Sequence, residues 1–399
     1  MRKIFIITTL LPALLACNPP LFDQSSREQP DSGRTPPPSL RDTTQKEPDV
    51  YVTAIMFPDS VNWRKGGTEG ATLVLLKNAQ VVMSLPAGPR PRADNHCYQD
   101  GHLWVNDTDG FQTTVSCDGS TLFAYPGEEQ MPGFLIDNGQ VHTLGQKPGG
   151  GFCYRIDGME AFTCRDGIVL GEADDPDWPG GALMRDTSGV HFTYGISHQS
   201  ADAEVWEYRV MNGTEIRKEL TMPAGGKLFD ARVYDGKLYR LEWRYGRYCL
   251  IVDEVLTPLP AEGAPQGLKL LTVNGNIMVK GFEIQNREPV CWLQGADTLR
   301  YEYGYPRLPV GDLLIEGDRQ YALVMDGEDC VLLIYRGEEF IARFPLETYR
   351  LHTRRSVAFR KEILALALTH DDADENLLWV NGKEYPLRFN GYFTGVYIE

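Results

Sequence analysis

The chain has 399 residues, of which 42% are hydrophobic, and a formal net charge of −16 at pH 7. The hydrophobic fraction leaves ample material for a core. A nucleic-acid partner needs a basic footprint that neutralises phosphates, and no such footprint is visible in the sequence outside the N-terminal Arg2-Lys3, so the composition disfavours nucleic acid.

Residues 1–16 have the pattern of a lipoprotein signal peptide. Arg2-Lys3 is followed by an apolar run from Ile4 to Leu15, which is too short to span a membrane as a mature helix. The ending Leu14-Leu15-Ala16-Cys17 resembles the bacterial lipobox, which implies that the preceding peptide is removed and that Cys17 carries the lipid anchor. The alternative is an ordinary secretory signal with a chance cysteine.

The residue that follows Cys17 indicates in which membrane the protein is anchored. In the lipobox family the signal for retention in the inner membrane is usually Asp at this position, and this chain has Asn18. The resemblance therefore implies the outer membrane. Residues 17–48 are rich in Pro, Ser, Asp and Gln and almost free of aromatics, which predicts a disordered tether that holds a folded domain away from the membrane.

Residues 49–399 repeat. Two-residue turns join short β-rich runs, and Asn-Gly and Asp-Gly are the pairs that tolerate positive φ in a tight hairpin. One series of turns is Asn78-Ala79, Asp118-Gly119, Asp157-Gly158, Asn212-Gly213, Asp253-Glu254, Gln294-Gly295, Arg336-Gly337 and Asn381-Gly382. A second series lies between its members: Asp100-Gly101, Asn138-Gly139, Ser188-Gly189, Asp235-Gly236, Asn274-Gly275, Gly317-Asp318 and Arg360-Lys361.

Two interleaved series with a shared period of about 42 residues indicate two hairpins, hence four strands, per repeat. The sequence therefore predicts an all-β fold: a single eight-bladed β-propeller with four-stranded antiparallel blades, or seven blades if the irregular third repeat is divided differently. The first repeat has only three good strands. The C-terminal run Tyr392–Ile398 supplies the missing one, which closes the ring and removes two exposed sheet edges.

Seven cysteines follow Cys17, and four of them open the third strand of their repeats. Recurrence at one repeat position predicts small buried hydrophobes rather than metal ligands. The sequence has no CxxC and no histidine at metal-ligand spacing, so no structural zinc is expected. Cys153 and Cys164 flank one hairpin and are the only plausible disulfide, although the Asp-Gly turn places them diagonally, not directly, across the two strands. The four recurring cysteines are Cys153, Cys249, Cys291 and Cys330.

Function is expected at the loops that join the second strand to the third and the fourth to the next blade, because these loops crowd one face of a propeller. The aromatic faces of Trp63, Trp178, Trp243 and Tyr245, framed by arginines, can hold sugar rings or peptide side chains, although the same aromatics can simply cap the blades. The candidate ligand-binding residues are Trp63, Arg64, Arg92, Trp178, His198, Trp243, Arg244 and His370. No catalytic motif is present.

Two acidic clusters lie in these loops. Hard oxygen ligands at this density are weak candidates for Ca²⁺, but neither cluster matches an EF-hand and both are equally explained as solvated loops. No other cofactor is expected. The clusters are Asp174, Asp175 and Asp177, and Asp371, Asp372 and Asp374.

The lipobox, the tether and the four-stranded repeats together resemble propeller lipoproteins of Gram-negative envelopes, including the propeller subunit of the outer-membrane protein assembly machinery. The fuller repeat signature of that family is not met, so its assembly role is not implied. Two functions remain open: a non-catalytic binding or scaffolding protein for an envelope protein or glycan, or a carbohydrate-active enzyme (glycoside hydrolase or polysaccharide lyase). The absence of a recognisable nucleophile or base motif favours binding.

Overall fold

The structure is a computed structural model. It describes residues 49–88, 95–127, 129–171, 181–199, 204–223, 225–259, 266–273, 276–285, 288–294, 298–302, 312–316, 319–326, 331–336 and 339–399. These residues belong to one unit, Glu47–Glu399. The other unit, Met1–Lys46, lies outside the described residues, and so does the predicted anchor Cys17. None of the described helices has the length and apolar character needed to cross a membrane.

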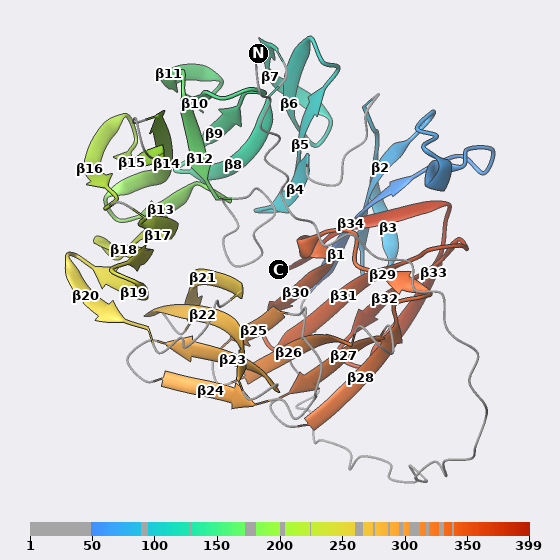
Figure 1. Ribbon diagram of the computed structural model, residues 1–399. Helices are drawn as coiled ribbons and strands as arrows, with labels where there is room; N and C mark the ends of the chain where they lie inside the picture. The colour runs from blue at the N-terminus through green and yellow to red at the C-terminus, as the bar shows by residue number, and fades with distance from the viewer. Residues whose placement is uncertain are drawn as a thin grey trace, which may run out of the picture. The chain divides into compact units, whose positions relative to one another are not determined.

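Strands make up almost all of the described secondary structure, and they pair into eight antiparallel sheets, which we number as blades along the chain (Figure 1). Blade 1 contains β34 (Gly391–Ile398), β1 (Val50–Met56), β2 (Thr72–Lys77) and β3 (Gln80–Pro86). Blade 2 contains β4 (His96–Gln99), β5 (His102–Thr108), β6 (Gln112–Cys117) and β7 (Ser120–Pro126). Blade 3 contains β8 (Gln130–Asp137), β9 (Gln140–Gln146), β10 (Phe152–Ile156) and β11 (Met159–Cys164).

The first strand of blade 4 is split into β12 (Gly167–Leu170) and β13 (Met184–Asp186), which both pair with β14 (Gly189–Gln199) ahead of β15 (Glu204–Asn212) and β16 (Glu215–Thr221). Blade 5 contains β17 (Lys227–Tyr234), β18 (Lys237–Arg244), β19 (Arg247–Val252) and β20 (Val255–Pro258). Blade 6 contains β21 (Gln266–Val273), β22 (Asn276–Gln285), β23 (Glu288–Gln294) and β24 (Thr298–Glu302).

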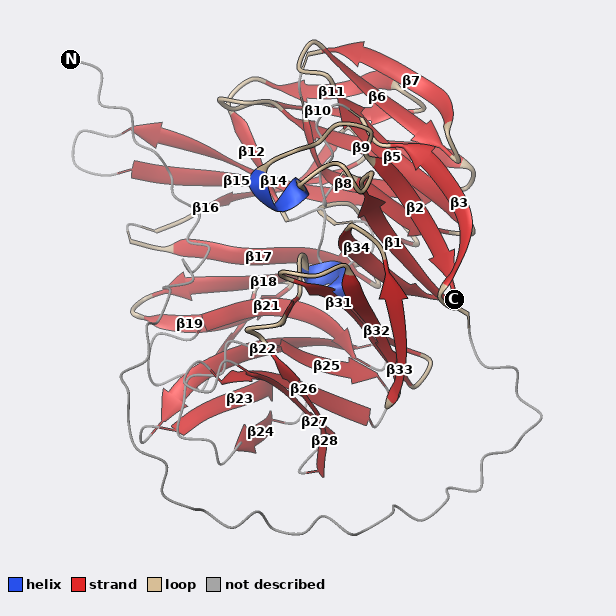
Figure 2. Cartoon of the chain, turned by 90° about the vertical axis from the view of Figure 1, so that its right-hand side faces the viewer, coloured by secondary structure: helices blue, strands red, loops and turns tan. Residues whose placement is uncertain are grey.

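Blade 7 contains β25 (Asp312–Glu316), β26 (Arg319–Asp326), β27 (Val331–Arg336) and β28 (Glu339–Pro345). In blade 8, β29 (Tyr349–Arg350) and β30 (Val357–Arg360) both pair with β31 (Ile363–His370), followed by β32 (Glu375–Val380) and β33 (Lys383–Arg388). Two short 3-10 helices, η1 (Trp63–Lys65) and η2 (Arg354–Ser356), interrupt the strands (Figure 2). The predicted class, an all-β propeller of four-stranded antiparallel blades, is confirmed.

The ring closes as predicted, because the last strand pairs with the first. β34 runs antiparallel to β1, from Val50 opposite Ile398 to Met56 opposite Gly391. Its side chains Phe393, Val396 and Ile398 join a buried cluster with residues of blades 1 and 8. The C-terminal strand is therefore part of the core of two blades.

The recurring Asn and Asp of the turns have a structural role. In blades 1, 2, 3, 5 and 8 an Asn or Asp follows the third strand. Its side-chain oxygen accepts a hydrogen bond from the backbone N–H of a residue in the second strand, at 2.8–3.0 Å. Its own N–H donates to the carbonyl of that same residue. Asn and Asp also tolerate the positive φ that this position requires. The turn residues are Asn78, Asp118, Asp157, Asp253 and Asn381.

Among the predicted turns whose residues are all described, three are displaced by one residue. In blade 4, Asn212 still pairs with Glu215 in the ladder, so the turn is Gly213-Thr214 rather than Asn212-Gly213. The turn predicted at Ser188-Gly189 is Thr187-Ser188, because Asp186 pairs with Gly189. The turn predicted at Arg360-Lys361 is Lys361-Glu362, since Arg360 pairs with Ile363.

The outer strands are irregular. In blades 1, 2, 3, 4 and 7 the register between the third and fourth strands shifts by one residue, which is a β-bulge near the start of the fourth strand. The outer strands of blades 5, 6 and 8 pair with their third strands without a shift. Those of blades 5 and 8 contain Pro258 and Pro386, respectively, and that of blade 6 contains no proline.

The cysteine predictions are confirmed in part. Cys153 and Cys249 are fully buried within their third strands, as expected for small hydrophobes. The side chain of Cys291 and all of Cys330 lie outside the described residues. The candidate disulfide does not form: Cys153 and Cys164 are both free. The register places Cys153 opposite Thr163 and Cys164 opposite Phe152, and the Thr163 hydroxyl donates to the Cys153 sulfur at 3.4 Å.

Candidate functional site

Several of the predicted site residues meet where blade 1 adjoins blade 8. Arg64, in η1 between β1 and β2, reaches the loop from His370 to Asp374 between β31 and β32. Its guanidinium donates to the carbonyls of Asp371 and Ala373 at 2.5 and 2.6 Å, and to that of His370 at 3.3 Å. It also forms an ion pair with Asp374 at 3.4 Å. Arg64 therefore connects the loop between β1 and β2 of blade 1 to the loop between β31 and β32 of blade 8.

Trp63 packs beneath this arginine. The Arg64 guanidinium lies 4.6 Å from the centroid of the Trp63 ring, and the ring also contacts Phe57, His352 and Tyr392 at 5.1–6.3 Å between centroids. Trp63 is half-buried, and its indole N–H has no partner among the described residues. Burial lowers the pKa of His352 to about 4, so its imidazole is neutral at neutral pH. Trp63 thus has a packing role within the fold, whether or not it also binds a partner.

The acidic loop is held by cations of the chain. The carboxylate of Asp371 forms an ion pair with Arg350, and Asp374 faces Arg64. The Nδ1 atom of His370 accepts the backbone N–H groups of Asp372 and Ala373 at 3.1 and 2.9 Å, assuming the tautomer protonated on Nε2. Among the described residues, these three aspartates do not come close enough together to share a metal ion. The loop resembles a salt-bridged turn more than a Ca²⁺ cage.

The other described candidates lie on blades 4 and 5, at the same ends of their strands. His198, near the end of β14, is half exposed and lies 3.4 Å from the carboxylate of Glu207. Trp243, in β18, packs edge-on against Tyr248. Arg244 forms an ion pair at 2.9 Å with the fully buried Glu242. No described contact joins this set to the cluster around Arg64.

The remaining candidates, namely Arg92, Trp178, Asp174, Asp175 and Asp177, lie outside the described residues. The segment that contains Trp178 was expected in a loop between blades. The structure places it between β12 and β13, which both pair with β14, so it interrupts the innermost strand of blade 4. The hairpin pattern of the sequence gives no sign that one strand is split in two.

Two aromatic residues are prominent on the loop face: Phe111, which the sequence analysis missed, and Tyr245, which it placed there beside Trp243 and Arg244. Phe111, in the turn between β5 and β6, is 85% exposed, and Tyr245, in the turn between β18 and β19, is 75% exposed. Both are aromatic residues in tight turns between the second and third strands, where polar residues and glycine are usual. That contrast is the signal by which the sequence could have identified Phe111.

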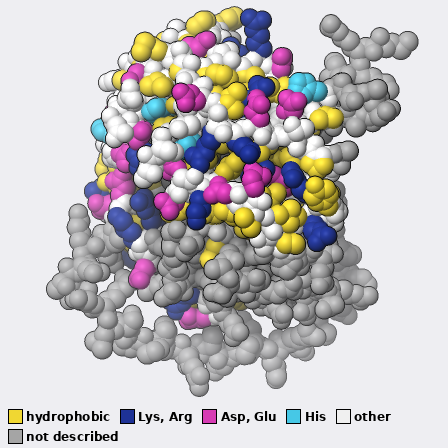
Figure 3. All heavy atoms as spheres, turned by 90° about the vertical axis from the view of Figure 1, so that its left-hand side faces the viewer, with side chains coloured by type: hydrophobic (Ala, Val, Ile, Leu, Met, Phe, Trp, Pro, Cys, Tyr) yellow, Lys and Arg dark blue, Asp and Glu magenta, His cyan; other side chains and the backbone are white. Residues whose placement is uncertain are grey.

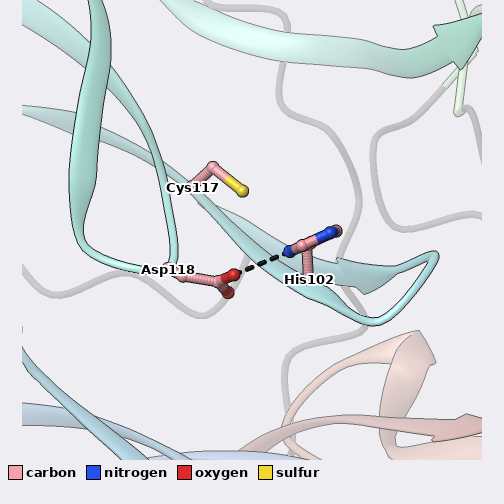
Figure 4. A group of neighbouring side chains, drawn as sticks. All are labelled: His102, Cys117 and Asp118. Carbon is pink, nitrogen blue, oxygen red and sulfur yellow. Dashed lines mark hydrogen bonds and ion pairs between the residues drawn. The ribbon is translucent and has the colours of Figure 1, made fainter. Parts of the chain in front are cut away.

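Sequence spacing also missed a cluster of His102, Cys117 and Asp118 in blade 2 (Figure 4). One ligand atom from each side chain lies within 4.8 Å of the others. His102 and Cys117 are 15 residues apart, which matches no familiar metal motif. They meet because β5 and β6 are antiparallel, with Trp104 opposite Cys117.

The chain is similar in fold to several solved structures. The dihydro-heme d1 dehydrogenase NirN, in complex with DHE, has a TM-score of 0.50 at 12% identity, over 87% of this chain and 74% of that chain. AztD from Citrobacter koseri has a TM-score of 0.48 at 10% identity, over 88% and 97% of the two chains. BamB from Moraxella catarrhalis has a TM-score of 0.43 at 12% identity, over 81% and 95%.

No protein-family model matches the sequence, and no curated protein matches it either. At the identities of the solved structures, the similarity shows the β-propeller fold alone. The propeller likeness expected from the sequence is therefore confirmed, and the lipoprotein character stays a prediction.

Proposed function

We propose that this chain is a lipid-anchored protein of the bacterial outer membrane whose propeller binds a protein or glycan partner through the loops between the second and third strands. The lipobox-like ending at Cys17 and the Pro-rich segment after it support the anchoring. The binding role is supported by the loop face itself, because rigid scaffolds commonly present recognition residues on exposed loops.

The observation that carries the binding role is the exposure of Phe111 and Tyr245. Large aromatic side chains are common anchors at protein and glycan interfaces, since they bury much area at low entropic cost. Trp63, in contrast, is half-buried against Phe57 and Tyr392, whereas Tyr245 stays 75% exposed although the Arg244 guanidinium lies 6.0 Å from its ring centroid. We therefore assign recognition first to Phe111 and Tyr245.

The outer surface is compatible with a neutral partner. One face of the molecule carries acidic, basic and hydrophobic side chains side by side, without a continuous basic patch (Figure 3). That face does not offer the one-signed surface that a nucleic-acid backbone requires.

The double variant Phe111→Ala/Tyr245→Ala should lose partner binding while keeping its melting temperature. Removing an aromatic anchor at an interface costs more than about 1 kcal/mol, so each substitution is expected to weaken binding roughly fivefold or more. The measurement is pull-down from envelope extracts, together with a glycan array. Met159→Ala, at a 73% exposed residue on an outer strand, is the matched control and should leave binding unchanged. Equal capture by the double variant and the wild type would show that another surface recognises the partner.

The variant Cys17→Ala should move the protein from the membrane fraction to the soluble fraction of the envelope. The acyl chains on Cys17 supply the proposed attachment, and without that cysteine no thiol remains at the predicted processing site. Fractionation followed by immunoblotting measures the distribution. Unchanged membrane association would mean that the ending at Cys17 is not a lipobox.

A further inference from the structure

His102, Cys117 and Asp118 bring three kinds of metal-binding atom together at the turn between β6 and β7. In Figure 4 the Asp118 carboxylate points at the His102 ring, and the Cys117 sulfur lies beside them. The Nδ1 atom of His102 is 2.7 Å from Oδ2 of Asp118. The side chains of His102 and Asp118 are 52% and 33% exposed, so an ion can reach them from solvent.

The propeller repeat itself creates this convergence. Asp118 is the turn residue that accepts the N–H of Leu103 with Oδ1, as its equivalents do in four other blades. That contact fixes the carboxylate and leaves Oδ2 for another partner. The residue before Leu103 is His102, and the residue before Asp118 is Cys117, so both flank the fixed carboxylate.

Blade 1 shows that these three positions interact. There they are occupied by Asp49, Lys77 and Asn78, and the Lys77 ammonium lies 2.8 Å from the Asp49 carboxylate. The Asn78 amide donates to the same carboxylate at 3.1 Å. In the other three blades the positions hold residues that do not make a metal site: Gln140, Ile156 and Asp157; Lys237, Val252 and Asp253; and Ile363, Val380 and Asn381. Among these five blades, only blade 2 combines an imidazole, a thiol and a carboxylate.

We propose that His102, Cys117 and Asp118 form a binding site for a divalent transition-metal ion of the zinc type. Zinc takes nitrogen, sulfur and carboxylate ligands at about 2.0–2.3 Å in tetrahedral geometry. Small rotations of the partly exposed side chains bring their ligand atoms to the separations that this geometry needs. Three protein ligands leave the fourth position open to water or to a ligand from another molecule.

Metal binding at this site is coupled to protonation, because a metal ion binds the thiolate form of cysteine and the thiol proton is released.

The test uses the full-length chain, purified in detergent without a histidine tag and stripped of metal, and titrated with Co²⁺ and then Zn²⁺. We expect one Co²⁺ per chain, the visible spectrum of a tetrahedral ion and a sulfur-to-cobalt charge-transfer band, both abolished by Zn²⁺. Each substitution introduces the residue type that another blade has at the equivalent position, so the variants should keep the structure of the repeat. Cys117→Val should abolish the charge-transfer band, and His102→Gln and Asp118→Asn should each weaken binding at least tenfold.

The matched control is Asp157→Asn, the same change at the same turn position of blade 3, and it should leave binding unchanged. Melting curves without metal check that each variant is folded. The proposal is overturned if the wild type gives no tetrahedral cobalt spectrum, or if the spectrum persists in Cys117→Val. It is equally overturned if His102→Gln binds as tightly as the wild type, because other residues would then hold the ion.

Discussion

Deleting residues 391–399 should abolish soluble expression or lower the melting temperature by many degrees. The deletion removes β34, with the buried side chains Phe393, Val396 and Ile398. Burial of each such side chain contributes about 1.5–3 kcal/mol, and a whole domain is stable by only about 5–15 kcal/mol. The deletion also leaves β1 with an unpaired edge, which favours aggregation.

The control for this experiment is deletion of Glu399 alone. That residue follows β34 and has hydrogen bonds with Gly101, Tyr98 and Asp49. It contributes no side chain to the buried hydrophobic cluster of β34, so its loss should have a much smaller effect than the long deletion. Thermal unfolding followed by circular dichroism compares the two variants with the wild type. If the long deletion melted like the wild type, β34 would not be the strand that closes the ring.

Glu129→Ala should destabilise the propeller by about 3–5 kcal/mol, because it leaves the charge of Arg155 buried without a partner. The two side chains are 2% and 8% exposed, and they form a bidentate pair at 2.7 and 2.9 Å. The Arg155 guanidinium also lies 3.8 Å from the centroid of the Tyr125 ring. This pair links blade 3 to the connection from blade 2, so its loss should loosen the contact between them. Denaturant unfolding measures the change.

A double variant distinguishes the buried charge from mere loss of packing. Glu129→Leu/Arg155→Met removes both charges and should be markedly more stable than Glu129→Ala. At the surface pair Arg185 and Asp137, where the arginine is 56% exposed, Asp137→Asn should cost less than about 1 kcal/mol. A double variant as unstable as Glu129→Ala would contradict the electrostatic explanation.

The repeat could be predicted because it depends on residue types that recur at the hairpin turns. Asn and Asp at the turns are visible in the sequence, and the structure shows why they recur: each side chain holds a neighbouring strand, as Asp118 holds Leu103. The closing strand Tyr392–Ile398 could be predicted because the first repeat lacked a strand. The displaced turn at Gly213-Thr214 shows the limit, since the sequence around Asn212 fits two hairpin registers that differ by one residue.

The site was harder to predict, because its contacts join residues far apart in the chain. Arg64 meets the loop after His370 across the ring closure, a contact that no local pattern encodes. The sequence marked both residues as members of the loop face, but it did not show that they bind each other. The cluster of His102 and Cys117 was missed for the same reason, since only the strand register brings the two together.

The bulges and prolines of the outer strands limit how other molecules can attach to the rim. A regular edge strand offers a row of free N–H and C=O groups on which a foreign strand can be added. The shifted register near Leu75 and Leu76, its equivalents in four other blades, and Pro386 in β33 break up that row. Copies of the protein at high concentration would therefore resist joining edge to edge at these blades into a continuous sheet. A partner that binds the rim at these blades must recognise side chains rather than extend the backbone ladder.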